Sequence, residues 1–498
     1  MQEALKIHEL DNVAIALKTL SEGQKITVNE EEITLLQEVP AGHKFTLKGL
    51  ETGNLVIKYG YSIGKTIAPI RKGEWVHNHN IKTGLGELLN YEYHPENAKP
   101  VSEKKNSKES HTFPGYRREN GSVGIRNEIW IIPTVGCVND VSRQIERLGR
   151  EYLTDEIDEL VAYTHPYGCS QLGDDQSNTQ KILSGLINHP NAAGVLVVGL
   201  GCENNSIEEM KKHIGAYSQD RVKFLICQDY DDEIEQGVKL IKELVGYASG
   251  FKRERIDAGE LIIGLKCGGS DGFSGITANP AVGAFSDLLV ADGGTTILTE
   301  VPEMFGAETI LMDRCADEEL FHKTVSLIND FKQYFIDHDQ PIYENPSPGN
   351  KKGGISTLED KSLGCTQKSG DAIINGVLKY GESVKEKGLI LLSAPGNDLV
   401  ASTALAASGA HIVLFTTGRG TPFGSPVPTI KIASNSTLAN TKKNWIDFDA
   451  GRLLDGMTLQ ELSQELFRLV LETAGGKKVR SEENGYRDIA IFKQGITL

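Results

Sequence analysis

The stretch EIWIIPTVGCVND, residues 128–140, begins as an apolar run and changes at a glycine and a cysteine into polar residues. The same change occurs in PYGCSQ around Cys169 and in GLGCENN around Cys202. Helical stretches such as VSRQIERLGREYL separate these runs, and hydrophobic strands alternating with amphipathic helices are typical of a parallel sheet covered on both faces. Ligands bind beyond the carboxyl ends of such strands, so Cys137, Cys169 and Cys202 are predicted to lie on a functional edge.

A purely structural explanation of the three Gly-Cys steps stays open. Glycine permits a sharp turn, and cysteine often acts as a small buried hydrophobic residue. Three such steps in one domain favour a shared pocket wall, but their spacing matches no metal or iron–sulfur motif.

Further along the chain, the charged stretch KRERIDAGE marks a boundary, and a second strand–helix series follows it with LIIGLKC, TTILTEV, GLILLSA, HIVLFTT and PTIKIAS. Before the first series, residues 11–93 form short strand-like runs with frequent turn glycines, which predicts a small all-β module. The predicted organisation is therefore multi-domain: a β module at 1–94, an extended polar linker at 95–112, an α/β domain at 113–255 (the middle domain) and a second α/β domain at 256–498 (the final domain).

Charge and composition exclude several classes of protein. The formal net charge of -16 argues against a nucleic acid or an anionic membrane as partner. No apolar run is long enough to span a membrane, and the first 20 residues contain no secretory signal. Seven cysteines without CxxC pairs indicate reduced thiols, which predicts a cytoplasmic protein.

The final domain holds most of the residues with chemical potential. The glycine-rich loop KCGGSDGFSG follows a strand and presents backbone N–H groups to an anion, although it lacks the GxGxxG and GK[ST] patterns of nucleotide sites. Thiols and carboxylates near strand ends can hold Fe²⁺ or Mn²⁺, and the predicted metal ligands are Cys267, Asp271, Glu300, Cys365 and Asp398. For Asp271 and Asp398 the alternative is turn or helix-capping duty.

Two further groups stand out in the chain. In WVHNHN, His77 and His79 are two residues apart, so on a strand they would face the same side and could bind a metal or act as acid and base. In GYRRENGSVGIRNE, three arginines, among them Arg126, could clamp a carboxylate. The alternatives are a polar strand surface and a solvated loop.

The longer motifs resemble those of a known family. WVHNHN, GYRRENGSVGIRN, KCGGSDGFSGITANPAVG, LTEVPEMFGAE and TTGRGTPFGSPVPTIKIASN together resemble the altronate and galactarate dehydratase family. The resemblance implies an N-terminal SAF-type (β-clip) module, a middle domain used for homodimerisation, and a Rossmann-like final domain that holds the metal. It also implies dehydration of a sugar acid with Fe²⁺ or Mn²⁺, and the chain looks closer to the altronate branch, which forms 2-dehydro-3-deoxy-D-gluconate from D-altronate.

Roles for individual residues follow as hypotheses. The predicted catalytic acid or base is His77 or His79, with Lys368 as a reserve base. The predicted substrate-binding residues are Arg126, Asn397, Arg419, Ser425 and Lys431. The alternatives are galactarate dehydratase or another hydroxy-acid lyase, a non-catalytic sugar-acid-binding protein, and an NAD-dependent dehydrogenase, which the missing GxGxxG disfavours.

Overall fold

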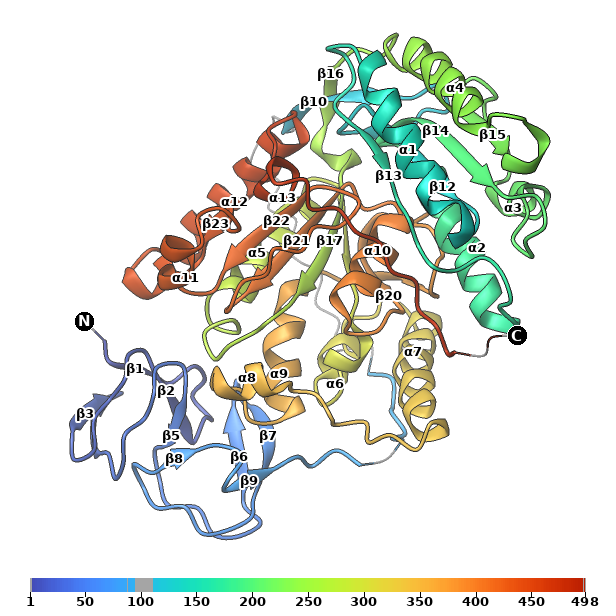
Figure 1. Ribbon diagram of the computed structural model, residues 1–498. Coiled ribbons are helices and arrows are strands. Elements are labelled where there is room, and N and C mark those ends of the chain that lie inside the picture. Colours follow the sequence, from blue (N-terminus) through green and yellow to red (C-terminus); the bar gives the residue numbers. More distant parts are fainter. Residues whose placement is uncertain (1, 87, 95–110, 496, 498) are drawn as a thin grey trace.

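The computed structural model describes residues 2–86, 88–94, 111–495 and 497 (Figure 1). At the N-terminus, short antiparallel strands form the β module, in which β1-β2-β5-β8, β3-β4 and β6-β7-β9 are the hydrogen-bonded sheets. The strands are Ala4–Leu5 (β1), Val13–Ala16 (β2), Lys25–Val28 (β3), Glu31–Thr34 (β4), Lys44–Thr46 (β5), Leu55–Lys58 (β6), Tyr61–Thr66 (β7), Trp75–Val76 (β8) and Ile81–Lys82 (β9). This confirms the predicted small all-β module.

The middle domain contains a four-stranded sheet in the order β13-β12-β14-β15, and every neighbouring pair is parallel. Its strands are Glu128–Pro133 (β12), Leu160–Ala162 (β13), Ala192–Gly199 (β14) and Val222–Ile226 (β15), and its helices are Asn139–Gly149 (α1), Gly173–Ile187 (α2), Ile207–Ile214 (α3) and Glu233–Ala248 (α4). Helices α1 and α4 pack together on one face, while α2 and α3 cover the other. All residues of β12 and β14 are buried, because helices cover both faces of the sheet.

The final domain is built on a seven-stranded sheet in the order β19-β20-β18-β17-β21-β22-β23, again parallel throughout. The strands are Ile262–Cys267 (β17), Thr295–Leu298 (β18), Ile374–Leu378 (β19), Gly388–Leu392 (β20), Ile412–Thr417 (β21), Thr429–Ala433 (β22) and Phe448–Asp449 (β23). Helices α5 (Ala278–Ala291) and α12 (Leu459–Ala474) cover one face, and α10 (Asp398–Ala407) packs on the other, where it also contacts α2. The prediction of two α/β units with parallel sheets is confirmed.

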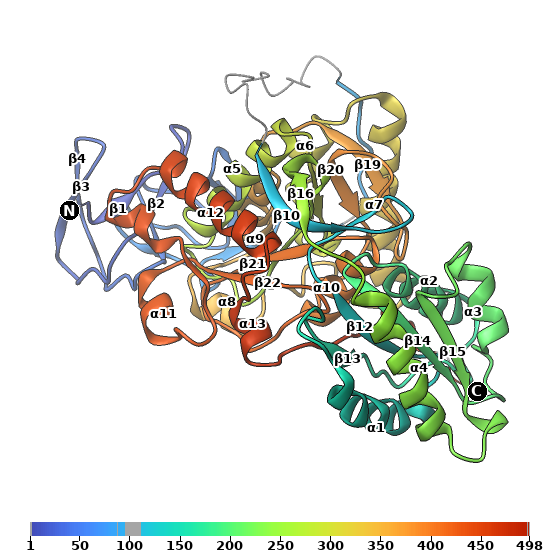
Figure 2. The ribbon, with the colours of Figure 1, turned by 90° about the horizontal axis from the view of Figure 1, so that it is seen from above.

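The remaining helices of the final domain flank this sheet. They are Glu308–Met312 (α6), Glu318–Asp337 (α7), Pro348–Lys352 (α8), Leu358–Cys365 (α9), Ser436–Thr441 (α11) and Arg480–Glu483 (α13). Figure 2 shows the seven-stranded sheet between the β module and the middle domain. None of the helices in the described residues is both long and apolar enough to cross a membrane.

The two α/β domains are joined at more than one place. Strand β10 (Thr112–Arg117) pairs with β11 (Val123–Gly124) and with β16 (Glu254–Asp257), so β16 runs across the boundary expected at residues 255 and 256. Most of the expected linker, residues 95–110, lies outside the described residues, and its last residue, Thr112, already begins β10. The C-terminal segment returns to the middle domain, where Arg487 pairs with Glu128 at 2.8 Å.

Buried histidines strengthen this junction. His411 donates from Nε2 to the Val123 carbonyl at 2.8 Å and accepts the Ile262 N–H at Nδ1 at 3.0 Å. His189 likewise contacts the Ala410 carbonyl through Nε2 and the Asn191 N–H through Nδ1. In each ring one nitrogen donates and the other accepts, which is the pattern of a neutral imidazole.

Candidate active site

The carboxyl ends of four central strands of the final domain converge on one cleft, and we call this the final-domain edge. β17 ends at Cys267, β18 is followed by Glu300 and Glu303, β20 by Asn397 and Asp398, and β21 by Arg419. The cleft has a volume of about 590 Å³, and its walls include Cys267, Glu303, Lys351, Lys361, Asn397 and Asp398. The strand order reverses on either side of β17, which is where open α/β sheets place their ligands.

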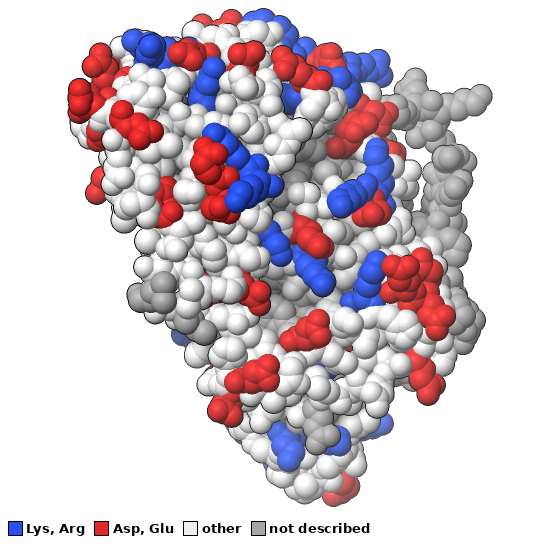
Figure 3. Space-filling view, turned by 90° about the vertical axis from the view of Figure 1, so that its right-hand side faces the viewer, with Lys and Arg blue, Asp and Glu red and all other residues white. Residues whose placement is uncertain are grey.

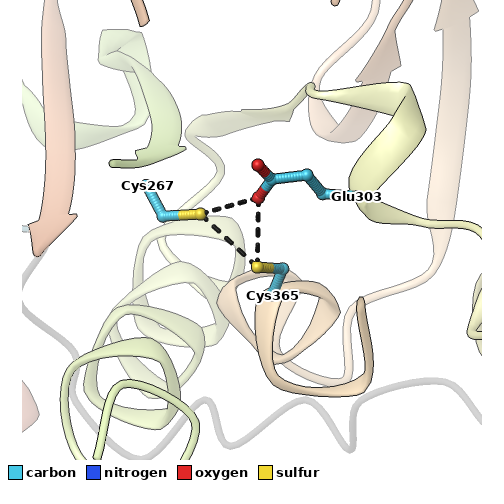
Figure 4. Close-up of side chains that lie close together, drawn as sticks. All are labelled: Cys267, Glu303 and Cys365. Atoms are coloured by element: carbon cyan, nitrogen blue, oxygen red, sulfur yellow. Dashed lines mark hydrogen bonds between the residues drawn. The ribbon is translucent and has the colours of Figure 1, made fainter. Parts of the chain in front are cut away.

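Two thiols and one carboxylate meet beside this cleft (Figure 4), and two of the three residues, Cys267 and Glu303, line it. Cys267 Sγ lies 3.0 Å from Glu303 Oε2 and 3.4 Å from Cys365 Sγ, and Cys365 Sγ lies 3.2 Å from the same carboxylate oxygen. All three side chains are buried. Among the described residues, these form the one group of at least three His, Cys, Asp or Glu whose ligand atoms all lie within 4.8 Å of one another.

Glu303 was not among the predicted ligands, and Glu300 was predicted in its place. Glu300 has a left-handed backbone with φ 70°, which turns the chain after β18 into the short helix Val301–Glu303 and brings Glu303 back toward Cys267. The carboxylate of Glu300 is engaged elsewhere: Oε2 accepts the Cys267 N–H at 2.9 Å, and Oε1 is bound by Lys266. Glu300 therefore borders the group of three, with its Oε1 3.9 Å from Cys267 Sγ. In the sequence, the one signal for Glu303 as a site residue was its place among the polar residues that follow the strand β18.

Buried lysines surround these carboxylates. Lys361 Nζ donates to Glu303 Oε1 at 2.7 Å, and Lys266 Nζ lies 3.0 Å from Asp398 Oδ1 as well as beside Glu300. Lys368 Nζ is 3.6 Å from Glu300 Oε2. Burial alone would raise the pKa of Glu303, but Lys361 and Lys266 hold it well below its usual range. Three lysine ammonium groups thus face three carboxyl groups, and burial together with the neighbouring Glu303 raises the pKa of Glu300.

This donor set fits a divalent transition ion. An ion bound at about 2.0–2.3 Å separates neighbouring ligand atoms by roughly 3 to 4 Å, which matches the distances between the two sulfur atoms and the oxygen. The hydrogen bond that the Cys365 thiol donates to Cys267, together with burial, raises the pKa of Cys365 well above its usual range, so this thiol is protonated when no ion is bound. A divalent ion bound here would displace the Cys365 proton, because a cysteine binds a metal ion as the thiolate.

The other two predicted ligands lie apart from the group of three. The Asp271 carboxylate is buried and accepts hydrogen bonds from Ser274 N, Ser434 Oγ and Asn435 Nδ2, which is the turn duty considered as its alternative. Asp398 lies in the cleft wall at the first position of α10, where it pairs with Lys266. The cap of that helix is Asn397, whose Oδ1 accepts the N–H groups of Leu399 and Val400 at 3.1 Å.

Of the five predicted substrate-binding residues, Asn397 lines the cleft, whereas Arg126, Arg419, Ser425 and Lys431 are not among its lining residues. Arg126 is buried at the junction of the middle and final domains, and its five N–H groups are used by the Glu482 carboxylate and by backbone carbonyls, so none remains for a substrate. Ser425 Oγ binds within its own turn, to Val427 O and Thr429 Oγ1. Lys431 is buried in β22, where burial lowers its pKa to about 8.

Arg419, another predicted substrate-binding residue, is exposed beside the cleft. A Cβ added at Gly349, in the segment that rims the cleft, would lie 3.8 Å from Arg419 Cδ, and one added at Gly269 would lie 3.5 Å from Arg419 Cβ. Lys351 is a second cation of the cleft wall. On the face of the molecule seen in Figure 3, basic and acidic side chains are interspersed and do not form a broad basic surface.

The prediction that His77 and His79 face the same side of a strand is wrong. Strand β8 ends at Val76, and residues 77–80 form a turn in which Asn80 N–H donates to the His77 carbonyl. His77 is buried and stacks on Trp75, with its pKa lowered to about 3 by burial and by nearby Lys44 and His43. His79 is exposed, and neither histidine is among the residues that line the cleft.

The three Gly-Cys steps of the middle domain do lie beyond the carboxyl ends of their strands, and we call these loops the middle-domain edge. Cys137, Cys169 and Cys202 are all exposed. Cys169 Sγ contacts Asn204 Oδ1 at 3.6 Å, and Cys202 Sγ accepts from Gln228 Nε2 at 3.9 Å. Their position is as predicted, but they do not converge as Cys267 and Cys365 do.

Comparison with known families covers nearly the whole chain. Residues 2–84 match the altronate/galactarate dehydratase SAF domain, residues 115–249 match the second domain of D-galactarate dehydratase/altronate hydrolase, and residues 258–497 match the C-terminal domain of D-galactarate/altronate dehydratase. These limits agree with the three structural units described above.

Individual proteins match along their full length. An altronate dehydratase of Bacillus subtilis (strain 168) is 55% identical, with 100% of both chains covered, and an altronate dehydratase of Escherichia coli (strain K12) is 54% identical, with 99% of both covered. A galactarate dehydratase (L-threo-forming) of Escherichia coli (strain K12) is 34% identical and covers 98% of this chain and 96% of its own.

Proposed function

The chain belongs to the altronate/galactarate dehydratase family, and from this premise we propose that it is a hydro-lyase that converts D-altronate into 2-dehydro-3-deoxy-D-gluconate and water. The observation that carries the choice of substrate is the identity to two altronate dehydratases, 54% and 55%, against 34% to a galactarate dehydratase. The polar cleft at the final-domain edge is large enough for a six-carbon acid and opens beside the cations Lys351 and Arg419.

We propose that Cys267, Cys365 and Glu303 hold the metal ion. Thiolate ligands favour Fe²⁺ over Mn²⁺, because Mn²⁺ prefers oxygen donors. When bound, the ion supplies Lewis-acid polarisation of the substrate carboxylate, which lowers the cost of removing the proton at C2. The two buried thiols, their short distances to one another and to the Glu303 carboxylate, and the neighbouring cations Lys266, Lys361 and Lys368 support this assignment.

Two side chains of the cleft are suited to proton transfer. Lys361 Nζ uses two of its three N–H groups on Glu303 and Asn345, which leaves one to donate to the departing hydroxyl. Asp398 pairs through Oδ1 with Lys266, and its Oδ2 accepts no hydrogen bond from the described residues, so it is the carboxylate we assign to the C2 proton. Lys368, the earlier reserve base, is surrounded by Cys267, Cys365, Glu300 and Glu303, which raise its pKa well above the usual range despite burial; it stays protonated.

Replacing Asp398 distinguishes its proposed role as general base from its earlier predicted role as metal ligand. Asp398→Asn should lower kcat by about 10²–10⁴-fold while the bound metal remains, because the proton acceptor is lost and the ligands are intact. Glu344→Gln, which changes an exposed carboxylate of the same cleft, serves as the control and should keep most of the activity. A loss of metal in Asp398→Asn would return Asp398 to the list of ligands.

The overall assignment is tested by anaerobic purification with metal analysis, followed by assays of 2-keto acid formation from altronate, galactarate and sulfolactate. We expect Fe²⁺-dependent turnover with altronate as the preferred substrate, by a factor of about ten or more in kcat/KM. Preference for galactarate or sulfolactate would assign the chain to a different branch of the family. Binding without any keto-acid product would favour a sugar-acid-binding protein.

We also propose a fold group for the final domain, an oligomeric state and a cellular location. The strand order β20-β18-β17-β21-β22-β23 corresponds to the doubly wound order 3-2-1-4-5-6, with β19 added at one edge, and this supports grouping the final domain with Rossmann-like folds. We further propose that the chain forms a homodimer through the middle domain, which exposes Leu172 and Tyr230, and light scattering would test this. Seven unpaired cysteines support a cytoplasmic location.

A further inference from the structure

The β module is attached to the final domain by two lysines that share one carboxylate. Lys58 Nζ lies 2.9 Å from Asp360 Oδ1, and Lys44 Nζ lies 2.9 Å from Asp360 Oδ2. The side chains of Lys44, Lys58 and Asp360 are 1%, 4% and 0% exposed. Burial alone would lower the pKa of Lys58, but Asp360 raises it, whereas Lys44 keeps a pKa below its usual range. A single carboxylate thus neutralises two buried ammonium groups only in part.

Asp360 belongs to the helix that delivers two residues of the site. Every residue of α9, Leu358–Cys365, is buried, and the helix carries Lys361, which binds Glu303, and Cys365 at its end. Two further contacts from the β module reach the start of this helix. Thr83 Oγ1 donates to Glu359 at 2.9 Å, and Thr357 Oγ1 donates to the Ile63 carbonyl at 2.5 Å.

The β module also touches the loop that follows the other thiol. A Cβ added at Gly272 would lie 1.9 Å from the Gly42 carbonyl oxygen, and one added at Gly275 would lie 2.1 Å from the Tyr59 hydroxyl. The same hydroxyl would lie 3.6 Å from a Cβ added at Gly364, in α9. Tyr59 therefore lies between the loop that begins at Cys267 and the helix that ends at Cys365, and Gly42 packs against the same loop and against Gly353 and Gly354.

We propose that Lys44 and Lys58 are positioning residues that fix α9, and with it Cys365 and Lys361, relative to Cys267. The β module is then a permanent part of the frame around the metal site. The inference rests on the proposed function in one respect, since it assumes that Cys267, Cys365 and Glu303 bind the ion. Replacing one lysine removes one of the contacts that hold the fully buried helix α9 in place. The distance between the sulfur atoms of Cys267 and Cys365 is therefore the quantity that should change.

The test uses the full-length protein loaded with Co²⁺, whose thiolate absorption bands report bound cysteine without any substrate. Lys58→Met should weaken Co²⁺ binding by about 10–100-fold and reduce the thiolate band, because the change alters the support of a ligand and spares the ligand itself. Lys65→Met removes an exposed lysine of the same module and should leave both measurements at the wild-type level. Thr83→Val, a milder change at the same interface, should shift affinity in the same direction by a smaller factor.

The outcomes separate the two proposals. Wild-type Co²⁺ affinity and spectrum in folded Lys58→Met, or in Thr83→Val should Lys58→Met fail to fold, would overturn the positioning role while the metal site stands. Absence of a thiolate band in the wild-type protein would instead overturn the metal site, and the positioning role with it. Restoration of affinity by Lys58→Arg, which keeps the positive charge, would support the ion pair as the cause.

Discussion

The middle-domain edge and the final-domain edge present the same sequence pattern and differ in what the fold makes of it. Both are carboxyl ends of parallel strands that pass through glycine and cysteine into polar residues. At the middle-domain edge, Cys137, Cys169 and Cys202 are exposed, with amide side chains as neighbours of two of the thiols. At the final-domain edge, Cys267 is buried against Cys365 and Glu303. A cysteine at a strand end is therefore only a candidate metal ligand, and its surroundings in the fold decide whether it can bind an ion.

The difference comes from what covers each edge. Over the final-domain edge lie α9 and the β module, which exclude water and bring in Cys365, 98 residues away in the chain. Burial of this kind would be costly for isolated charges, and it is balanced by Lys266, Lys361 and Lys368. The three cysteines of the middle-domain edge stay exposed, so their loops remain open to solvent or to a partner.

The strongest test replaces one cysteine at each edge. Cys365→Ser should lower metal affinity by at least about 10²-fold and abolish most of the activity, since serine is a poor ligand at neutral pH. Cys202→Ser, the matched change at the middle-domain edge, should leave both properties within about twofold. Equal losses in the two variants would show that both edges take part in the chemistry.

Each edge also has a buried carboxylate that can be neutralised. Glu303→Gln should reduce metal affinity by about 10–100-fold, because one ligand oxygen and the partner of Lys361 are altered. Glu203 accepts hydrogen bonds from Thr134 Oγ1 and from the Gly201 N–H, so Glu203→Gln should cost about 1–3 kcal/mol of stability and keep the metal. Metal analysis and denaturant unfolding measure the two effects.

Acid should destabilise the middle domain and its junction with the final domain, because buried neutral histidines lie in both places. Burial lowers the pKa of His165 and His411 to about 4 and that of His189 to about 3, below the unfolded value of about 6.5. Between these values the unfolded chain binds more protons, so stability is complete above about pH 6.5 and falls as the pH drops, by up to about 1.4 kcal/mol per pH unit for each histidine.

Denaturant unfolding between pH 7 and pH 4 measures this slope, and replacing His411 by glutamine should reduce it. At the final-domain edge the pKa of Glu303 is lowered by Lys361 and Lys266 despite burial, so this carboxylate stays ionised over the same range. A stability that does not change with pH would contradict the neutral histidines at the junction.

The smallest effect concerns the accessibility of the thiols. A brief treatment of the native protein with an alkylating reagent should modify Cys137, Cys169 and Cys202, which are exposed, before Cys267 and Cys365, which are buried. Peptide mass spectrometry identifies the modified residues, and activity should persist while only the first three carry the label. Early labelling of Cys267 would mean that the final-domain edge opens more readily than its packing suggests.

The sequence by itself determined the features that depend on local pattern. Alternating apolar runs and amphipathic helices predicted both parallel sheets, and strand ends placed Cys267, Glu300 and Asp398 on the correct side of the final domain. The family motifs identified the SAF module and the reaction class, which agree with the matched domains. These predictions succeed because hydrophobic periodicity and turn residues act over a few neighbouring positions.

Only the tertiary structure decided which side chains meet. The left-handed backbone at Glu300 brings Glu303, rather than Glu300, to the two thiols. Arg126 joins the middle and final domains. His77 and His79 lie in a turn, where His77 is buried and His79 is exposed. Each outcome depends on contacts between segments far apart in the chain, such as α9 against the β module and β17. Local pattern carries no information on such contacts, because the distance between two side chains is set by the packing of the elements that bear them.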